Sequence, residues 1–467
     1  MGKGGKNVRS AAAPSIAATK KSSNDWVSPF TADRVDPRVG KKETLITFPT
    51  KSELRAVIPD HCFERSLFWS MAFVIRDILQ GCFVVYVVHN VLEMSTDPPA
   101  DGGIYAWIIW RLSWNLYAGI MGLALSGLWV IGHECGHGAF SEYPVVNGAV
   151  GWTLHSILLV PYFSWAFSHA KHHRRTNDMI EGETHMPVEP TKIGLTENQE
   201  RVPTEEVEKQ MFGGGLRQFA NKIFYWHAKF QEVIGDEAFA VFMMWSSFLF
   251  YCPLYLFGVT GRGKIGADGK PIPDDQIVDH LRPTSRLFPE KMYWKVVASN
   301  VGCLLVLGAC AYFSSIYGFR AVWFWYFGPY LVITGGLIAV TQLHHTHETV
   351  PQFDPDNWTW MKGVIAGTID RPHDWVFNTA THNIGSTHVL HHLFHTIPHY
   401  HAVEATECLR AYLEPKGLYN FDPTPGWKAL YEIGKNCHFV DSNTNGVQYY
   451  KSLKDVPRTT ESSKKVQ

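Results

Sequence analysis

The chain has 467 residues and a formal net charge of −1, so it lacks the strongly basic character of a nucleic-acid-binding protein. Its mean hydropathy of −0.10 would suit a soluble protein, but the apolar residues gather in a few long runs that the average conceals. The eight cysteines are scattered, which indicates reduced thiols rather than a disulfide framework.

The N-terminal segment is expected to be a cytosolic tail over residues 1–60. Residues 1–24 are small, basic and polar, without the apolar core of a secretory signal peptide. This composition predicts disorder up to about residue 45.

Five apolar runs approach or exceed the roughly 20 residues that a membrane-spanning helix requires. They cover about 72–92, 107–131, 238–259, 296–317 and 321–343, and a shorter run, 152–167, is interrupted by Pro161. The loop 93–105 is acidic, whereas the segment before the first run is rich in Lys and Arg. The positive-inside rule therefore places the N-terminus in the cytosol and this loop in the lumen.

Eight histidines form three short boxes that bracket these runs. They are His133 and His137, then His169, His172 and His173, then His388, His391 and His392. Spacings of three and four residues share one helix face, so each box is expected to aim its imidazoles at one point. An all-nitrogen ligand set favours a first-row transition metal over Mg²⁺ or Ca²⁺, and eight ligands indicate two ions.

A shared metal centre constrains the topology, because all three boxes must lie on one side of the membrane. The run 152–167 then cannot cross, and 296–317 with 321–343 forms a hairpin. Run 238–259, interrupted by Pro253, lies in or near the interface. We expect an all-α integral membrane protein with four transmembrane helices and a cytosolic helical cap that carries a histidine-rich di-metal site. The main domain would cover 61–440, followed by a cytosolic tail over 441–467.

The boxes resemble those of the membrane-bound fatty-acid desaturase family, in the microsomal Δ12 (oleate) branch of algal and fungal type. The similar segments are His-Glu-Cys-Gly-His-Gly-Ala-Phe (133–140), Ser-His-Ala-Lys-His-His-Arg-Arg-Thr-Asn (168–177), Gly-Ser-Thr-His-Val-Leu-His-His-Leu-Phe (385–394) and the run 413–425. Gly138 departs from many plant relatives, which carry a further His there.

This resemblance implies an O₂-dependent oxidoreductase with two iron ions that converts oleate in a membrane phospholipid to linoleate by a cis double bond at C12–C13. The chain has neither a nucleotide-binding glycine fingerprint nor a haem motif, so electrons must come from a separate donor. Relatives use cytochrome b5 and its NADH-dependent reductase. We expect an endoplasmic reticulum membrane protein with both termini cytosolic, and Lys464-Lys465 fits a dilysine retrieval signal.

The resemblance also implies a ninth ligand, His345, where the last run ends. His344 and His347 would point elsewhere, because neighbours one or two residues apart do not share a helix face. His382 also matches a histidine of the family and is a candidate metal ligand, or a hydrogen-bond donor to one of the ligands.

Two further sets of side chains are candidates for roles around the centre. Glu134 and Asp178 are candidates to accept the second ring N–H of ligand histidines. Lys171, Arg174 and Arg175 either hold a lipid phosphate or an acidic electron donor, or form a solvated face.

Other histidines are expected at the surface or in the core, namely His61, His89, His155, His185, His227, His280, His373, His395, His399 and His401.

Several alternatives remain open from the sequence. Methyl-end Δ15 (omega-3) desaturases, oleate hydroxylases and acetylenases share the boxes. His133-Glu-Cys-Gly-His137 also matches the His-Glu-x-x-His motif of intramembrane metalloproteases, but that reading leaves six box histidines unexplained. A metal transporter would instead place its ligands along a path at mid-membrane.

Overall fold

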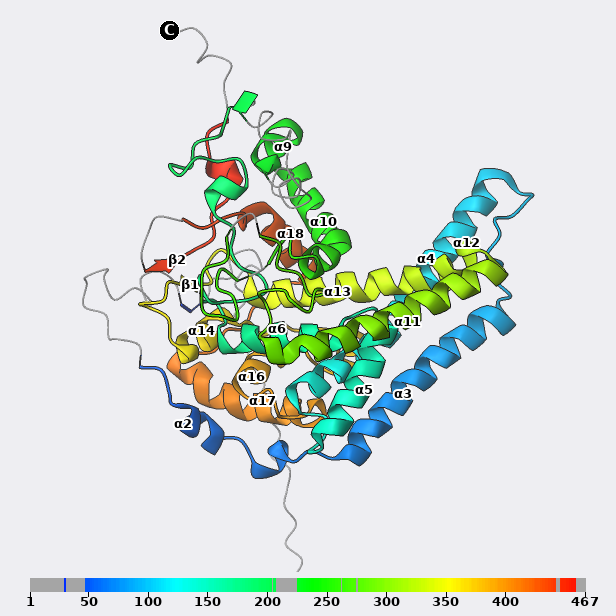
Figure 1. Ribbon diagram of the computed structural model, residues 1–467, viewed down its shortest axis with the longest axis horizontal. Coiled ribbons are helices and arrows are strands. Elements are labelled where there is room, and N and C mark those ends of the chain that lie inside the picture. The colour runs from blue at the N-terminus through cyan, green and yellow to red at the C-terminus, as the bar shows by residue number, and fades with distance from the viewer. Residues whose placement is uncertain are drawn as a thin grey trace, which may run out of the picture.

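The computed structural model describes residues 29–30, 47–203, 205–206, 225–261, 263–273, 276–441 and 446–458. Most of the expected N-terminal tail and the Lys464-Lys465 pair lie outside these residues. The described part is mostly helical, and its long helices extend to one side as an arm while short helices build a cap at the other side (Figure 1).

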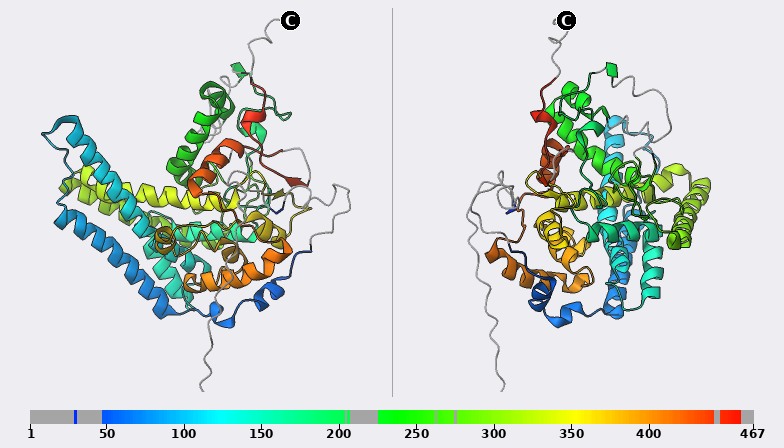
Figure 2. Two further views of the ribbon diagram at one scale, coloured as in Figure 1. Left: turned by 180° about the vertical axis from the view of Figure 1, so that it is seen from behind. Right: turned by 60° about the vertical axis from the view of Figure 1, so that its left-hand side comes forward.

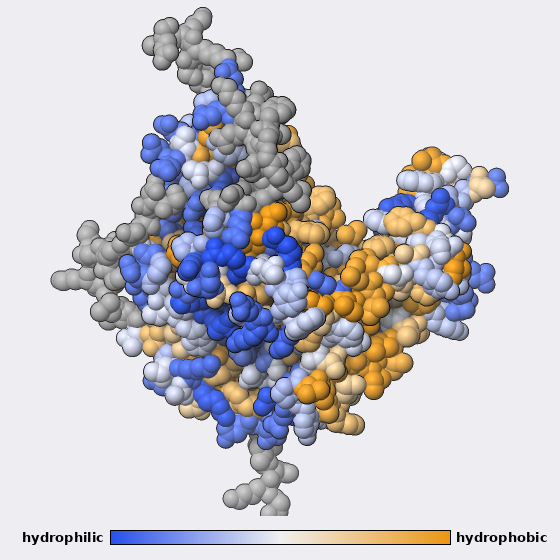
Figure 3. Space-filling view, viewed as in Figure 1, coloured by the Kyte–Doolittle hydropathy of each residue, from blue (hydrophilic) through white to orange (hydrophobic). Residues whose placement is uncertain are grey.

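The arm is built by α3 (Leu67–Tyr86), α4 (Gly103–His137), α11 (Tyr293–Tyr317) and α13 (Gly328–His345). The short α12 (Phe319–Val322) joins the last two. Large apolar side chains of α3 and α11 are exposed, for example Phe83 and Leu304. Figure 3 shows apolar side chains gathered on the arm and hydrophilic ones over much of the cap. Such a surface suits contact with lipid chains.

Helix α4 is too long for the membrane alone. Its 35 residues extend about 52 Å, against about 30 Å for a hydrocarbon core. The last turn, with His133 and His137, therefore projects beyond the apolar part. Helix α13 packs closely along α4, since a Cβ on Gly122 would lie 2.6 Å from the Val332 side chain.

Five helices are long and apolar enough to cross a membrane, and the fifth is α10 (Asp236–Leu256). A sixth candidate is the pair α5 (Pro144–Ile157) and α6 (Tyr162–Arg174), which is bent by 105°. Helix α10 runs across the direction of the arm and packs against α13 and α18 (Gly426–Asn436) (Figures 1 and 2). The predicted interruption, Pro253, lies in its last turn.

The cap surrounds the largest apolar core, in which Leu54, Ile365, Leu393 and Leu409 are fully buried. Its helices are α2 (Lys51–Ala56), α14 (Trp360–Gly367), α15 (Trp375–Ala380), α16 (His388–Leu393) and α17 (His399–Leu413), and α9 (His227–Ile234) precedes α10. The 3₁₀ turns are Asp60–Phe63, Pro190–Lys192, Glu290–Met292, Glu414–Lys416 and Leu453–Asp455, and π-helical turns cover Val87–Val91 and Trp323–Phe327.

One short sheet accompanies the helices in the described residues. Strand β1 (Gln352–Phe353) pairs antiparallel with β2 (Val447–Gln448), with Gln352 opposite Gln448. The following turn buries Leu453 against Phe239 and Ile193. Part of the segment assigned above to a C-terminal tail is therefore packed against the cap and α10.

Candidate metal centre

Four helices bring the histidine boxes together from distant parts of the chain. Box one ends α4, box two ends α6, and box three forms most of α16. His345 is the last residue of α13. The prediction that each box is helical is confirmed.

A first histidine group draws on all three boxes. Its members are His133, His137, His169, His173 and His391, with one ring nitrogen of each within 4.8 Å of all the others. The Nε2 atom of His133 lies 2.9 Å from that of His169 and 3.2 Å from that of His137. The His169 and His173 Nε2 atoms are 3.1 Å apart.

A second histidine group lies beside the first and contains His172, His345 and His392, all buried. His345 is its centre, because its Nε2 atom is 3.1 Å from that of His172. The Nε2 atom of His388 is 2.9 Å from the His345 Nε2 atom, so His388 extends this group. The first group has five histidines, and the second has four when His388 is included, so the two groups together hold nine.

Boxes two and three divide between the groups, so the expectation that a box aims at one point is wrong for them, whereas both histidines of box one lie in the first group. His172 lies in the second group and His169 and His173 in the first, while His391 separates from His388 and His392. The reason is helical geometry, since residues adjacent in sequence project roughly 100° apart around a helix. A box with ligands at both i+3 and i+4 can therefore reach two ions.

The ring nitrogens of these groups fit metal ions better than mutual hydrogen bonds. A neutral imidazole offers one donor and one acceptor, so converging Nε2 atoms cannot all find partners. The Nε2 atoms of His391 and His392 are buried without a hydrogen-bond partner. Burial lowers the pKa of His172 to about 4 and that of His391 well below its usual value. Neutral rings are the form that binds transition metals.

Acceptors behind the second group orient its rings. Nδ1 of His172 lies 3.0 Å from the Glu183 carbonyl oxygen, and Nδ1 of His345 lies 3.1 Å from that of Gly367. Nδ1 of His392 is 3.1 Å from the Thr176 hydroxyl. When Nδ1–H donates to these carbonyls, the Nε2 lone pair is left for a metal.

Glu134 and Asp178 serve groups other than the box histidines. The Glu134 carboxylate accepts from the backbone N–H of His399 at 2.6 Å and lies 2.8 Å from its Nδ1. Asp178 accepts the backbone N–H groups of Ile180 and Glu181 at 2.9 and 3.0 Å, so it shapes the turn after α6.

His382 lies in neither histidine group. Its Nε2 atom is 2.8 Å from Oδ2 of Asp77, a fully buried carboxylate of α3 that also pairs with Arg76 at 2.7 Å. Burial of this carboxylate requires such partners. His382 therefore links α3 to the segment before box three.

The three cations near box two differ in their surroundings. Lys171 lies 3.3 Å from Glu183 and donates to the Ile265 carbonyl at 3.0 Å. Arg175 pairs with Asp178 and Glu181, so both side chains fasten the loop after α6. Arg174 is the exposed one of the three.

Sequence reasoning missed several residues around the centre. The His395 ring stacks on His137 with centroids 4.9 Å apart, and His185 lies 6.3 Å from the His345 ring. His185 also lies 2.8 Å from the Thr341 hydroxyl. His185 is isolated in the sequence, whereas His395 follows His391 by four residues and could have been recognised from that spacing.

Asp370 holds the helix of box three. Its Oδ1 atom accepts the Val389 backbone N–H at 2.8 Å at the start of α16, and its other oxygen accepts from the Tyr419 hydroxyl. Burial raises the Asp370 pKa to about 7.

The next residue, Arg371, holds the end of α13. It is fully buried, donates to the Leu343 carbonyl at 2.8 Å and pairs with Asp422. The run 413–425 therefore anchors two of the helices that carry ligands.

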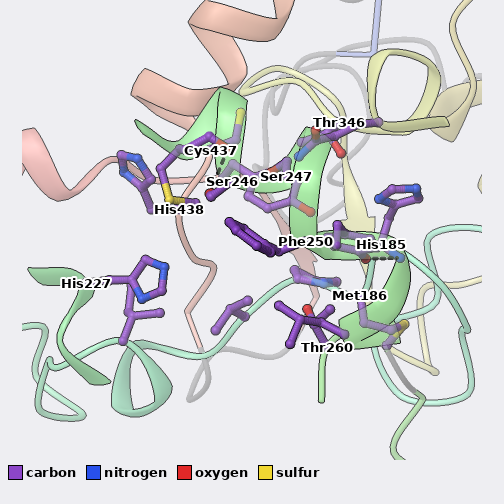
Figure 4. Close-up of a pocket in the computed structure, with 18 of the residues that line it drawn as sticks. His185, Met186, His227, Ser246, Ser247, Phe250, Thr260, Thr346, Cys437 and His438 are labelled. Atoms are coloured by element: carbon purple, nitrogen blue, oxygen red, sulfur yellow. Dashed lines mark hydrogen bonds between the residues drawn. The ribbon is translucent and has the colours of Figure 1, made fainter. Parts of the chain in front are cut away.

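An apolar pocket of about 400 Å³ opens beside the second histidine group (Figure 4). Helix α10 contributes Phe242, Ser247 and Phe250 to its wall. His185 lies at the end near His345, while His227 and His438 lie at the other end. A pocket of this size and character suits a flexible apolar ligand.

Comparisons with known proteins agree with this geometry. Residues 107–198 and 213–423 match the family model described as fatty acid desaturase. The chain is 32% identical to a Delta(12)-fatty-acid desaturase of Arabidopsis thaliana, over 84% of this chain and 88% of the relative. It is also 32% identical to an endoplasmic reticulum omega-6 fatty acid desaturase of Glycine max and to an oleoyl-12-hydroxylase of Ricinus communis, over 86% of this chain and 90% of each relative.

We expect Asp370→Ala to lower both the metal content and the melting temperature of the purified protein. The substitution leaves the Val389 N–H and the Tyr419 hydroxyl without their buried acceptor, which costs about 1–3 kcal/mol each. Asp370→Asn keeps an acceptor oxygen and should retain most of the metal. Equal metal loss in both variants would contradict a role through this oxygen.

Proposed function

Because the chain belongs to the fatty acid desaturase family and is therefore an oxidoreductase of fatty acid biosynthesis, we propose that it is an O₂-dependent acyl-lipid desaturase. It would insert a cis double bond at C12–C13 of oleate bound in a phospholipid and so form linoleate. Relatives named for Δ12 and omega-6 desaturation support this position of the bond.

The observation that carries the proposal is the pair of adjacent histidine groups beside an apolar pocket. The nine histidines would hold two iron ions, five ligands on one and four on the other. Iron bound there, with O₂ as co-substrate, would supply the oxidising power that side chains lack for removing hydrogen from unactivated CH₂ groups.

The residues of the chain would position the substrate and protect the site. Backbone carbonyls behind His172 and His345 fix the ring orientations. The pocket would hold the acyl chain between α10 and the end of α13 and keep water away from the centre. The bond that reacts would then depend on how far the chain enters.

A hydroxylase is the second candidate, because the oleoyl-12-hydroxylase relative is as similar as the desaturases. A Δ15 desaturase of the same family would give a different bond position. The metalloprotease alternative loses support, since both carboxylate oxygens of Glu134 already engage His399 and are not free to activate water.

We place the enzyme in the endoplasmic reticulum membrane with four crossings, by α3, α4, α11 and α13. The cap, the metal centre and both termini would face the cytosol. The orientation of α10 across the arm supports an interfacial position for it. Cytochrome b5 and its NADH-dependent reductase would supply two electrons per turnover, and the exposed Arg174 would suit an acidic donor surface.

Expression in a yeast that makes oleate but no linoleate should yield linoleate, identified by gas chromatography of total fatty acids. The His388→Ala variant should accumulate in membranes without product, because it loses a ligand of the second group. A hydroxylated product, or a Δ15 bond, would replace the Δ12 proposal. Full activity of His388→Ala would contradict a shared centre.

The assignment of His345 leads to a separate prediction. His345→Ala should lose iron and activity together, since its Nε2 atom is central to the second group. The matched control is His347→Ala, because His347 lies outside both groups and contacts Thr349 through Nδ1. Iron measured on purified protein separates ligand loss from poor folding. Retained iron in His345→Ala would remove it from the ligand set.

The four-crossing arrangement predicts the location of the loops. Glycosylation acceptors introduced into 93–105 should be modified in the lumen, whereas acceptors in 212–230 and 262–290 should stay unmodified. Gel mobility before and after glycosidase treatment measures this directly. Efficient modification within 262–290 would mean that α10 crosses the membrane.

A further inference from the structure

Four further metal-ligating side chains meet away from the two histidine groups. We call them the junction cluster. His61 and Cys62 come from the 3₁₀ turn Asp60–Phe63, and His401 and Glu404 come from α17. One ligand atom of each lies within 4.8 Å of the others. The turn leads from α2 toward α3 and runs beside α17 (Figure 1).

The distances in the junction cluster approach those of a tetrahedral site. Nε2 of His61 lies 2.9 Å from Oε2 of Glu404 and 3.7 Å from Sγ of Cys62. His401 and Glu404 are three residues apart and so share a face of α17. Ligand atoms around tetrahedral zinc, with bonds of about 2.0–2.3 Å, are roughly 3.3–3.7 Å apart. Small side-chain movements would therefore complete the site.

The chemistry of the four donors selects the ion. A sulfur ligand with two imidazoles excludes Ca²⁺ and Mg²⁺, which prefer oxygen, and suits Zn²⁺. Cys62 is fully buried, whereas His61 and Glu404 are half-exposed. An ion can thus enter from solvent and find the sulfur at the inner side.

We propose that the junction cluster is a structural zinc site, distinct from the desaturase centre. On binding Zn²⁺, the Cys62 thiol would release its proton to solvent, and four protein ligands would close the site. The ion would fasten the chain before α3 to α17, the helix whose first residue, His399, engages Glu134 of box one. This proposal does not depend on which fatty acid the enzyme modifies.

Cobalt provides a test that the all-histidine centre cannot imitate. The full-length protein, purified in detergent and treated with a chelator, is titrated with Co²⁺. We expect a sulfur-to-cobalt charge-transfer band in the near ultraviolet whose final intensity corresponds to one thiolate–cobalt bond per chain and that disappears when Zn²⁺ is added. Co²⁺ bound by histidines alone gives no such band.

Variants assign the band to the junction cluster. Cys62→Ser should abolish the band. The matched control is Cys408→Ser, because Cys408 is a free thiol that lies on α17 but outside the junction cluster, and this variant should keep the band. Glu404→Gln should keep the band with at least about tenfold weaker affinity for Co²⁺. Because Glu404 is half-exposed, this variant leaves the core intact.

Two results would overturn the proposal. If the unaltered protein shows no sulfur band, the junction cluster binds no metal through Cys62, and the contact of His61 with Glu404 is only a hydrogen bond. A band that persists in Cys62→Ser would assign the sulfur to another cysteine. Total zinc and iron, measured by mass spectrometry on each variant before chelator treatment, show whether the desaturase centre is intact.

Discussion

The arrangement of this protein depends on gathering nine neutral imidazoles in one buried place. Each ring loses hydration there, so each needs an acceptor behind it or a metal in front of it. The requirement fixes the last turn of α4, the end of α6, the end of α13 and all of α16 relative to one another. Close packing of α13 on α4 at Gly122 serves the same constraint.

Buried charges hold α13 and α16 in place and tie the cap to α3. Asp370 caps α16, the Arg371–Asp422 pair secures α13, and Asp77 with His382 ties the cap to α3. Such pairs contribute little net stability compared with apolar packing, yet loss of one partner costs about 3–5 kcal/mol. They therefore act mainly by excluding other arrangements, which suits a centre that tolerates little displacement of its ligands.

The sequence predicted features that follow from local spacing and failed where contacts are long-range. Helical spacing identified the boxes, and the family resemblance pointed to His345, which the structure places at the centre of the second group. The division of boxes two and three between the two groups was missed because the i+3 and i+4 positions were treated as equivalent. The pairs His382–Asp77 and His399–Glu134 join residues some 305 and 265 positions apart, so no periodicity could reveal them.

Helix α10 is long and apolar enough to cross a membrane, so the proposal that it lies at the interface must rest on its other features. Phe250 lines the pocket yet remains 56% exposed, and Trp245 of the same helix is 54% exposed. One side of α10 therefore faces the pocket and α18, while another offers apolar rings to the outside. A helix at the interface that both walls an acyl pocket and contacts lipid must be apolar around most of its circumference, just as a spanning helix is. Its direction across the arm, rather than its composition, is what argues for the interfacial position.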